Sequence, residues 1–190
     1  MLRLIETSPP TIEPLTLDEA KLHLRVTSTV EDALITSLII TARQICESFT
    51  GLALIERDYS LYLSEWPEGD ILLPLPPLVS VGLVNIYDAE GDATVFDAGN
   101  YTASDAGMPG RIFLNDGIFP PQPGRAADGI EIQFTAGYGD TATDIPQPLI
   151  QGIKQLLAHL YENRGDDKTD ALRASKAESL FQPFRIMSLV

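Results

Sequence analysis

The chain of 190 residues contains little cysteine, little histidine and no long apolar run. Its single cysteine, Cys46, excludes an internal disulfide and a cysteine-based zinc site. No window approaches the ~18 consecutive apolar residues of a membrane-spanning helix, and the N-terminal stretch MLRLIETSPP lacks the apolar core of a signal peptide. We therefore expect a protein that is made in the cytoplasm and has no membrane partner.

Basic residues are also scarce, with 13 Lys and Arg against 27 Asp and Glu, for a net charge of −14. The imbalance lies mainly in residues 54–145, which carry 15 acids and 3 bases, whereas residues 1–53 sum to −3 and residues 146–190 to +1. An acidic surface repels phosphate. Sequence-specific DNA binding through residues 54–145 is therefore not expected.

Motifs that carry chemistry are missing as well. The chain contains no G-x-G-x-x-G, P-loop, G-x-S-x-G or H-E-x-x-H sequence, and its histidines, His23 and His159, do not have metal-ligand spacing with another strong ligand. Acidic residues alternate in DAEGD, residues 88–92, but the spacing and closing glutamate of a calcium loop are absent. We expect no catalytic residue, no metal site and no cofactor, and a protein that is not an enzyme.

The clearest local signal is a helix within residues 145–165. Pro146 and Pro148 suit a first helical turn, and Gly165 suits the left-handed stop after a last turn. Apolar residues between them recur at one helical face: Leu149, Ile153, Leu156, Leu157 and Leu160. Such a helix requires a partner that covers its apolar face, and the best candidate lies more than a hundred residues upstream.

That candidate is the N-terminal region. Thr16 and Glu19 have capping-box spacing and predict a short helix, and Ser28 or Thr29 is expected to cap a longer one over about residues 30–49, ended by Gly51. Its predicted apolar face consists of Val30, Leu34, Leu38, Ala42, Ile45 and Phe49, and Cys46 beside it is expected to be a buried small hydrophobe rather than a nucleophile.

The middle of the chain has a different period. Short runs alternate in the two-residue rhythm of strands, as in Tyr59, Leu61 and Leu63 and in Ile130, Ile132 and Phe134, and residues 88–92 read as a hairpin turn. The sequence therefore predicts an α+β fold. Residues 1–53 and 146–190 form the two halves of a small helical bundle, and residues 54–145 form an inserted antiparallel β-domain.

The C-terminal end is unusually apolar. A last helical stretch, residues 171–181, is followed by a tail in which five of the final seven residues are apolar. Chain ends are more often polar and frayed. The pattern predicts docking, either on the protein's own core or on another subunit, and does not decide between them.

Four segments in this order resemble one family: LTLDEAKLHLRV, EDALITSLIITARQICESFTGLAL, IQFTAGYGD leading into IPQPLIQGIKQLLAHLYENRG, and AESLFQPFRIM. They resemble the head–tail connector (adaptor, or head-completion) proteins of long-tailed bacteriophages and gene transfer agents, over nearly the whole chain. The resemblance implies a structural virion protein that forms a ring, usually dodecameric, under the portal protein. It also implies that the ring extends the DNA channel and joins the capsid to the tail.

The resemblance also implies partners and a docking segment. The expected partners are further copies of the chain, the portal protein, a stopper or tail-terminator protein, and double-stranded DNA that passes through the lumen without sequence-specific binding. The implied portal-docking residues are Leu180, Phe181, Phe184, Arg185, Ile186 and Met187. The alternative hypothesis is a stand-alone acidic binding module that recognises a cation, a carbohydrate or a basic protein. A carboxylate-dependent hydrolase is a third hypothesis, with no motif to support it.

Overall fold

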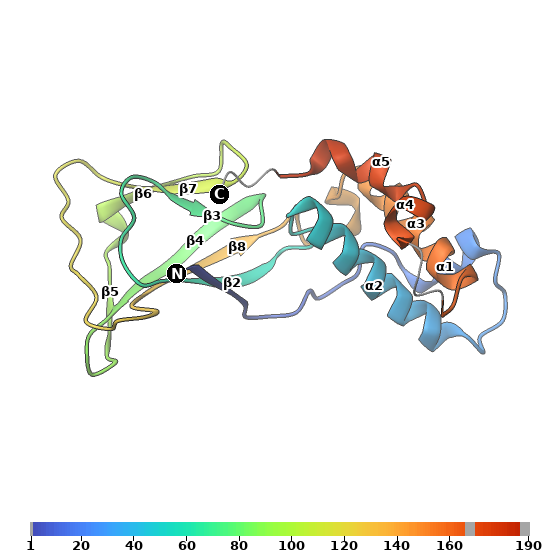
Figure 1. Ribbon diagram of the computed structural model, residues 1–190, viewed down its shortest axis with the longest axis horizontal. Coiled ribbons are helices and arrows are strands. Elements are labelled where there is room, and N and C mark those ends of the chain that lie inside the picture. Colours follow the sequence, from blue (N-terminus) through green and yellow to red (C-terminus); the bar gives the residue numbers. More distant parts are fainter. Residues whose placement is uncertain (1, 166–169, 187–190) are drawn as a thin grey trace. The chain divides into compact units, whose positions relative to one another are not determined.

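A computed structural model describes residues 2–165 and 170–186, which divide into two compact units. The strand unit combines the residues up to Pro10 with Glu56–Gly137, and the helical unit combines Thr11–Ile55 with the chain from Tyr138 onward (Figure 1). Helices and antiparallel sheets are thus segregated along the chain, which confirms the expected α+β class.

The larger sheet of the strand unit is antiparallel throughout, with the strand order β1-β2-β8-β4-β5. Its strands are β1 (Leu2–Glu6), β2 (Arg57–Leu63), β4 (Leu78–Tyr87), β5 (Ala93–Val95) and β8 (Ile130–Ala136). The alternating residues predicted in β2 and β8 lie opposite one another, as in the pairs Leu61–Ile132 and Tyr59–Phe134, and all four side chains are buried. The expected hairpin turn at residues 88–92 joins β4 to β5.

A smaller sheet has the order β3-β7-β6, from β3 (Ile71–Leu73), β6 (Tyr101–Ser104) and β7 (Gly110–Leu114). It buries Ile71, Leu73 and Ile112, which alternate with exposed neighbours along their strands. A 3-10 turn, η1 (Ala98–Asn100), leads into β6.

Strand β1 is the main departure from the expected organisation. Residues 1–53 are the first helical half in the sequence analysis, yet residues 2–10 lie with the strands, because β1 pairs antiparallel with β2. The run LRLIE is too short to show a period, and its partner lies more than fifty residues away in the sequence, so no local pattern predicts the pairing.

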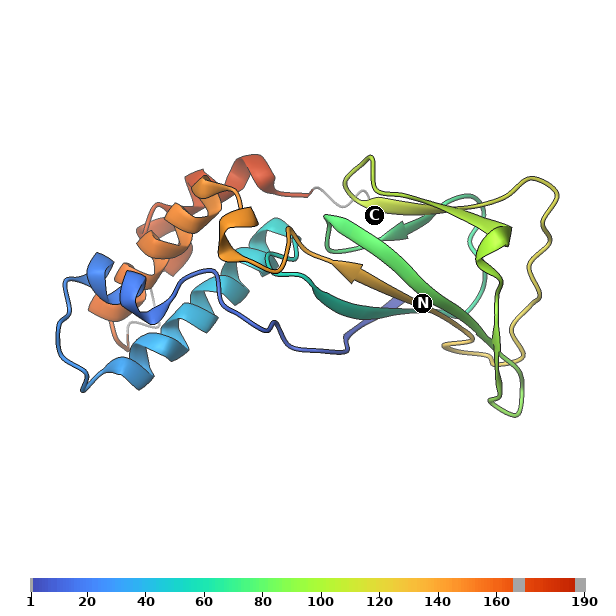
Figure 2. The same ribbon diagram turned by 180° about the vertical axis from the view of Figure 1, so that it is seen from behind.

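The helical unit contains α1 (Leu17–Leu24), α2 (Asp32–Thr50), α3 (Gln147–Glu162), α4 (Ala171–Ala174) and α5 (Ala177–Phe181), with 3-10 turns η2 (Ala142–Asp144) and η3 (Gln182–Phe184). Figure 2 shows the same helices from behind. Thr16 and Glu19 form the predicted capping box of α1, and Gly51 ends α2 with a φ of 75°. Of the described helices, none has the length and apolarity needed to cross a bilayer.

One apolar cluster holds this unit together, and it contains residues from both the early and the late helices. Leu149, Ile153, Leu156 and Leu157 of α3 are fully buried, as the periodicity predicts, and Leu160 packs at the edge. Residues 30–49 and the C-terminal helices therefore share one core, which is the association expected from their apolar faces.

The predicted face of α2 is partly wrong. The buried apolar residues are Ile35, Ile39, Ala42 and Cys46, while Leu38, Ile45 and Phe49 are only partly buried. Val30 precedes the helix and is 88% exposed. Apolar residues occur on more than one side of α2, so periodicity alone could not select the face. The expected Ser28 or Thr29 cap is also absent, because Glu31 occupies the N-cap position and its side chain makes no capping hydrogen bond to the helix.

Candidate assembly interface

The C-terminal segment, residues 170–186, is anchored in the helical unit by one aromatic side chain. Asp170 caps α4 by accepting hydrogen bonds from the backbone N–H groups of Leu172 and Arg173, at 3.1 and 3.4 Å. Phe181 on α5 is fully buried. Its ring packs on Gly152 of α3, where an added Cβ would lie 2.2 Å from Phe181 Cε1, so only glycine permits this approach.

The structure separates the predicted portal-docking residues into two groups. Phe181 belongs to the core of its own unit, so its side chain is not exposed for a partner. Leu180, Phe184 and Ile186 are partly buried at the edge of that core, and Arg185 is exposed. Met187 lies outside the described residues. The docking role of these residues stays a prediction.

Beyond Phe181 the segment follows the end of α2. The backbone N–H of Ile186 donates to the carbonyl oxygen of Thr50 at 2.8 Å. The Arg185 guanidinium carbon lies 5.1 Å from the centre of the Phe49 ring, a cation–π geometry. A shallow groove lies beside this contact, lined by the apolar side chains of Ile45, Phe49 and Leu172 and by polar groups. The segment thus presents a cation and partly exposed apolar groups from a fixed backbone.

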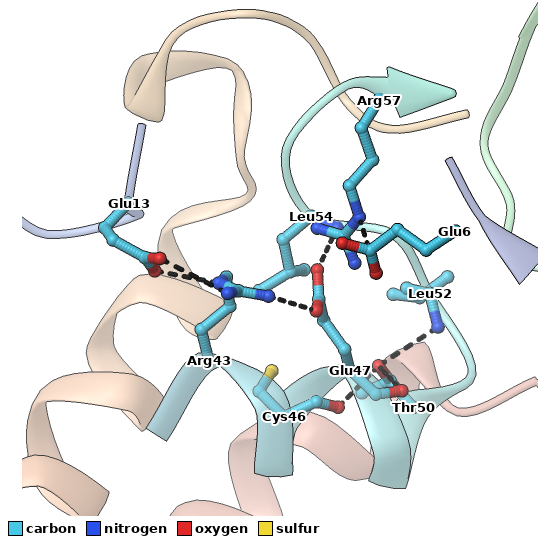
Figure 3. A network of polar contacts seen from close by, with 9 residues as sticks. All are labelled: Glu6, Glu13, Arg43, Cys46, Glu47, Thr50, Leu52, Leu54 and Arg57. Atoms are coloured by element: carbon cyan, nitrogen blue, oxygen red, sulfur yellow. Dashed lines mark hydrogen bonds and ion pairs between the residues drawn. The ribbon is translucent and has the colours of Figure 1, made fainter. Parts of the chain in front are cut away.

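A buried ionic network ties the residues before α1 to α2 (Figure 3). The Arg43 guanidinium, 5% exposed, binds both carboxylate oxygens of Glu13 at 2.8 and 3.2 Å and one oxygen of Glu47 at 2.7 Å. The other Glu47 oxygen accepts from the backbone N–H of Leu54 at 3.0 Å. Burial alone would lower the pKa of Arg43, but the bonds and charges of Glu13 and Glu47 outweigh it and raise that pKa.

The same view includes Cys46 and an ion pair of the strand unit. Cys46 is fully buried, as expected, and burial raises the pKa of its thiol, so it is not an activated nucleophile. Within the strand unit, Arg57 Nε lies 3.4 Å from a carboxylate oxygen of Glu6, which links β2 to β1. Neither feature forms a catalytic arrangement.

The strand unit buries a different kind of charged group. Glu131 on β8, 7% exposed, accepts hydrogen bonds from Tyr87 Oη at 2.7 Å, Ser60 Oγ and Tyr62 Oη at 2.9 Å, and Asn85 Nδ2 at 3.1 Å. Burial would raise the pKa of this carboxyl, but the four bonds outweigh it and lower the pKa to about 2. The bond to Glu131 also raises the pKa of Tyr87 to about 12. The carboxylate therefore ties β2, β4 and β8 together.

Neither the buried Glu131 nor the acidic turn at residues 88–92 forms a metal-ion site. Asp88 Oδ1 accepts from the backbone N–H groups of Gly91 and Asp92, both at 2.8 Å, so its carboxylate serves the hairpin turn. Across residues 2–165 and 170–186, no group of three or more His, Cys, Asp or Glu side chains is arranged to hold a metal ion.

Sequence reasoning missed both networks for the same reason. The Arg43–Glu47 spacing of four residues on a helix is a visible signal, but Glu13 lies 30 residues from Arg43. The donors to Glu131 come from two other strands, 44 to 71 residues away in the sequence. Only the folded chain brings the members of each network together.

A profile of the head completion protein family matches residues 13–172, and the chain belongs to this family. A comparison with curated proteins gave no match.

Solved structures agree with this assignment. The chain is 28% identical to a chain in "Neck of empty GTA particle computed with C6 symmetry", with a TM-score of 0.85 over 99% of this chain and 97% of the other. It is also 28% identical to a chain in "Neck of native GTA particle computed with C12 symmetry", with a TM-score of 0.80 over 100% and 97%. Similar values relate it to a chain in "Virion of native gene transfer agent (GTA) particle". The role of the chain is therefore that of a structural head–tail connector.

Proposed function

We propose that copies of this chain form a closed ring in the neck of a phage-like particle, between the portal and the tail. The observation that carries the proposal is the likeness to neck chains over almost the full length of both proteins, at 28% identity. Those necks were computed with C6 and C12 symmetry, which supports a ring of six-fold or twelve-fold order here.

The C-terminal segment is the portal-docking element of this ring. Phe181 and Gly152 fix its position, so the partly exposed side chains of Leu180, Phe184 and Ile186 require little ordering when a partner covers them. Arg185 adds an exposed cation that an acidic partner surface would bind. Met187 completes the element and lies outside the described residues.

The lumen of the ring passes DNA without gripping it. Residues 54–145 carry 15 acids and 3 bases, so a duplex that moves past them would meet repulsion rather than a row of phosphate contacts. The role is structural rather than catalytic, because a conduit and a joint require shape and interfaces, not chemistry. The ring also offers its far surface to a stopper or tail-terminator protein.

Binding to the portal protein tests this function. We expect Arg185→Glu to weaken binding of the purified chain to its portal by at least about tenfold, since a central interface arginine is a common hot spot. Arg173→Glu is the matched control, because Arg173 is exposed in the same segment but pairs with Asp170 and Glu178 of its own chain. Surface plasmon resonance gives both affinities. Absence of any wild-type binding would contradict the portal assignment.

A further inference from the structure

The loop between β7 and β8, residues 115–129, carries the most conspicuous exposed aromatic side chain of the strand unit. Phe119 is 93% exposed and contributes nothing to its own core. In Figures 1 and 2 this loop, yellow in the colour scale, takes a long path outside the two sheets. A partner that covered this side chain would remove a large apolar surface from water.

The loop is held to the strand unit at several points. The indole N–H of Trp66 donates to the carbonyl oxygen of Pro121 at 2.9 Å, and the backbone N–H of Gly124 donates to the carbonyl oxygen of Tyr87 at 2.9 Å. Arg125 places its guanidinium carbon 4.5 Å from the centre of the Tyr87 ring. An added Cβ at Gly124 would lie 2.3 Å from the backbone nitrogen of Ala89, so the loop packs directly on the hairpin turn.

These contacts make Phe119 a pre-ordered anchor. Pro120, Pro121 and Pro123 follow it and restrict the backbone, so little conformational entropy remains to be lost when a partner binds. An exposed aromatic ring on a fixed loop has the character of an interface hot spot that still lacks its pocket.

Charge indicates which partner can supply that pocket. The strand unit carries 14 acids and 4 bases in residues 1–10 and 56–137, a net charge of −10. A second copy of this unit would bring the same charge to the contact, and like charges across an interface are unfavourable. The one base of the loop, Arg125, lies over Tyr87. The complementary surface is therefore an apolar socket surrounded by lysine and arginine.

We propose that Phe119 inserts into an apolar socket rimmed by basic side chains on a neighbouring neck protein other than this chain. The proposal rests on the neck function proposed above and adds a second contact surface, in the strand unit, to the C-terminal segment. It identifies the partner by its chemistry, as a basic protein surface with an apolar depression.

Photo-crosslinking in assembled particles tests it. Benzoylphenylalanine at position 119 keeps the phenyl ring and adds a photoreactive benzoyl group, and irradiation followed by mass spectrometry identifies the peptide that it joins. We expect adducts with another neck protein, at a peptide that contains or adjoins Lys or Arg. Adducts with a second copy of this chain, adducts at an acidic peptide, or no adducts in particles that contain the chain would each overturn the proposal alone. Absence of the chain from particles would overturn the neck function as well.

A substitution gives an independent readout. Phe119→Ser should leave the melting temperature of the purified chain unchanged and lower the yield of tailed particles by at least about tenfold. Val95→Ser removes another exposed apolar side chain of the strand unit, 56% exposed, and should leave the yield unchanged. Equal yields for wild type and Phe119→Ser, or an equal loss in Val95→Ser, would contradict the role of Phe119.

Discussion

Each unit buries a glutamate, Glu47 in the helical unit and Glu131 in the strand unit, and the two carboxylates are compensated in different ways. In the helical unit Arg43 lies between the carboxylates of Glu13 and Glu47. In the strand unit, Glu131 accepts hydrogen bonds from three hydroxyl groups and one amide, and these neutral donors lower its pKa. The strand unit has 4 bases for 14 acids, so neutral donors stabilise a buried carboxylate where cations are scarce.

The strand unit shows how an acidic unit remains compact. Each acid at the surface of the strand unit adds electrostatic repulsion. The buried Glu131 on β8 instead links three strands, because its four hydrogen-bond donors come from β2 and β4. The helical unit carries 13 acids and 9 bases and uses an ordinary ion network instead. Removing the charge of Arg43 in one variant and of Glu131 in another tests the ion network and the neutral donors separately.

The largest effect is expected from Arg43→Ala. Breaking a buried ionic network by removing its shared cation costs about 3–5 kcal/mol, since Glu13 and Glu47 lose the charge that offsets their burial. Urea unfolding followed by circular dichroism measures the change. Arg164→Ala is the control, because the pair of Arg164 with Glu31 is open to solvent, which screens its charges, so the loss of stability should be much smaller. Equal losses of stability in the two variants would show that the buried network contributes no more than an exposed ion pair.

Glu131→Gln should have an intermediate effect, about 1–3 kcal/mol at neutral pH, because an amide replaces an acceptor that holds four donors. The pKa of Glu131 falls from the ordinary 4.5 to about 2 on folding, so the carboxylate contributes stability above about pH 4.5 that is lost as the pH falls toward 2. The difference in free energy of unfolding between wild type and Glu131→Gln should therefore narrow as the pH falls over that range.

Unfolding curves at several pH values measure this gap. Glu90→Gln changes an exposed carboxylate in the turn at residues 88–92 and should leave the free energy of unfolding at neutral pH unchanged. A gap that stays constant from neutral pH down to pH 2 would contradict the assignment of the low pKa to Glu131.

Thr16→Ala should have the smallest effect, about 1 kcal/mol, because it removes the capping box of α1. Thr16 Oγ1 accepts from the backbone N–H of Glu19 at 3.2 Å, and the Glu19 carboxylate accepts from the backbone N–H of Thr16 at 2.9 Å. Thr29→Ala is the matched change before α2, where no side chain caps the helix, and thermal melts should show no loss. A similar loss of stability in Thr29→Ala would contradict the conclusion that a side chain caps α1 but not α2.

How much of this fold is predictable depends on how local its signals are. The prolines and apolar face of α3, the capping box of α1 and the alternation in β2 and β8 each lie within one segment, and each matches the structure. The face of α2 is ambiguous because apolar residues surround it. Strand β1 and the donors of Glu131 depend on partners far away in the sequence, which periodicity cannot reveal.

The candidate interface shows the same limit. An apolar C-terminal segment predicts docking but does not distinguish residues that cover their own core from residues left for a partner. Phe181 covers its own core because Gly152 on α3 has no side chain and so leaves room for the Phe181 ring. Nothing near either residue in the sequence connects them. The exposure of Phe119 likewise follows from how the loop is tied to Trp66 and Tyr87.

Electron cryo-microscopy of the particle neck tests the central claim most directly. The account predicts a closed ring of this chain between portal and tail, with residues 180–187 against the portal protein. A neck that lacks this chain, or a chain bound there as a single copy, would contradict it.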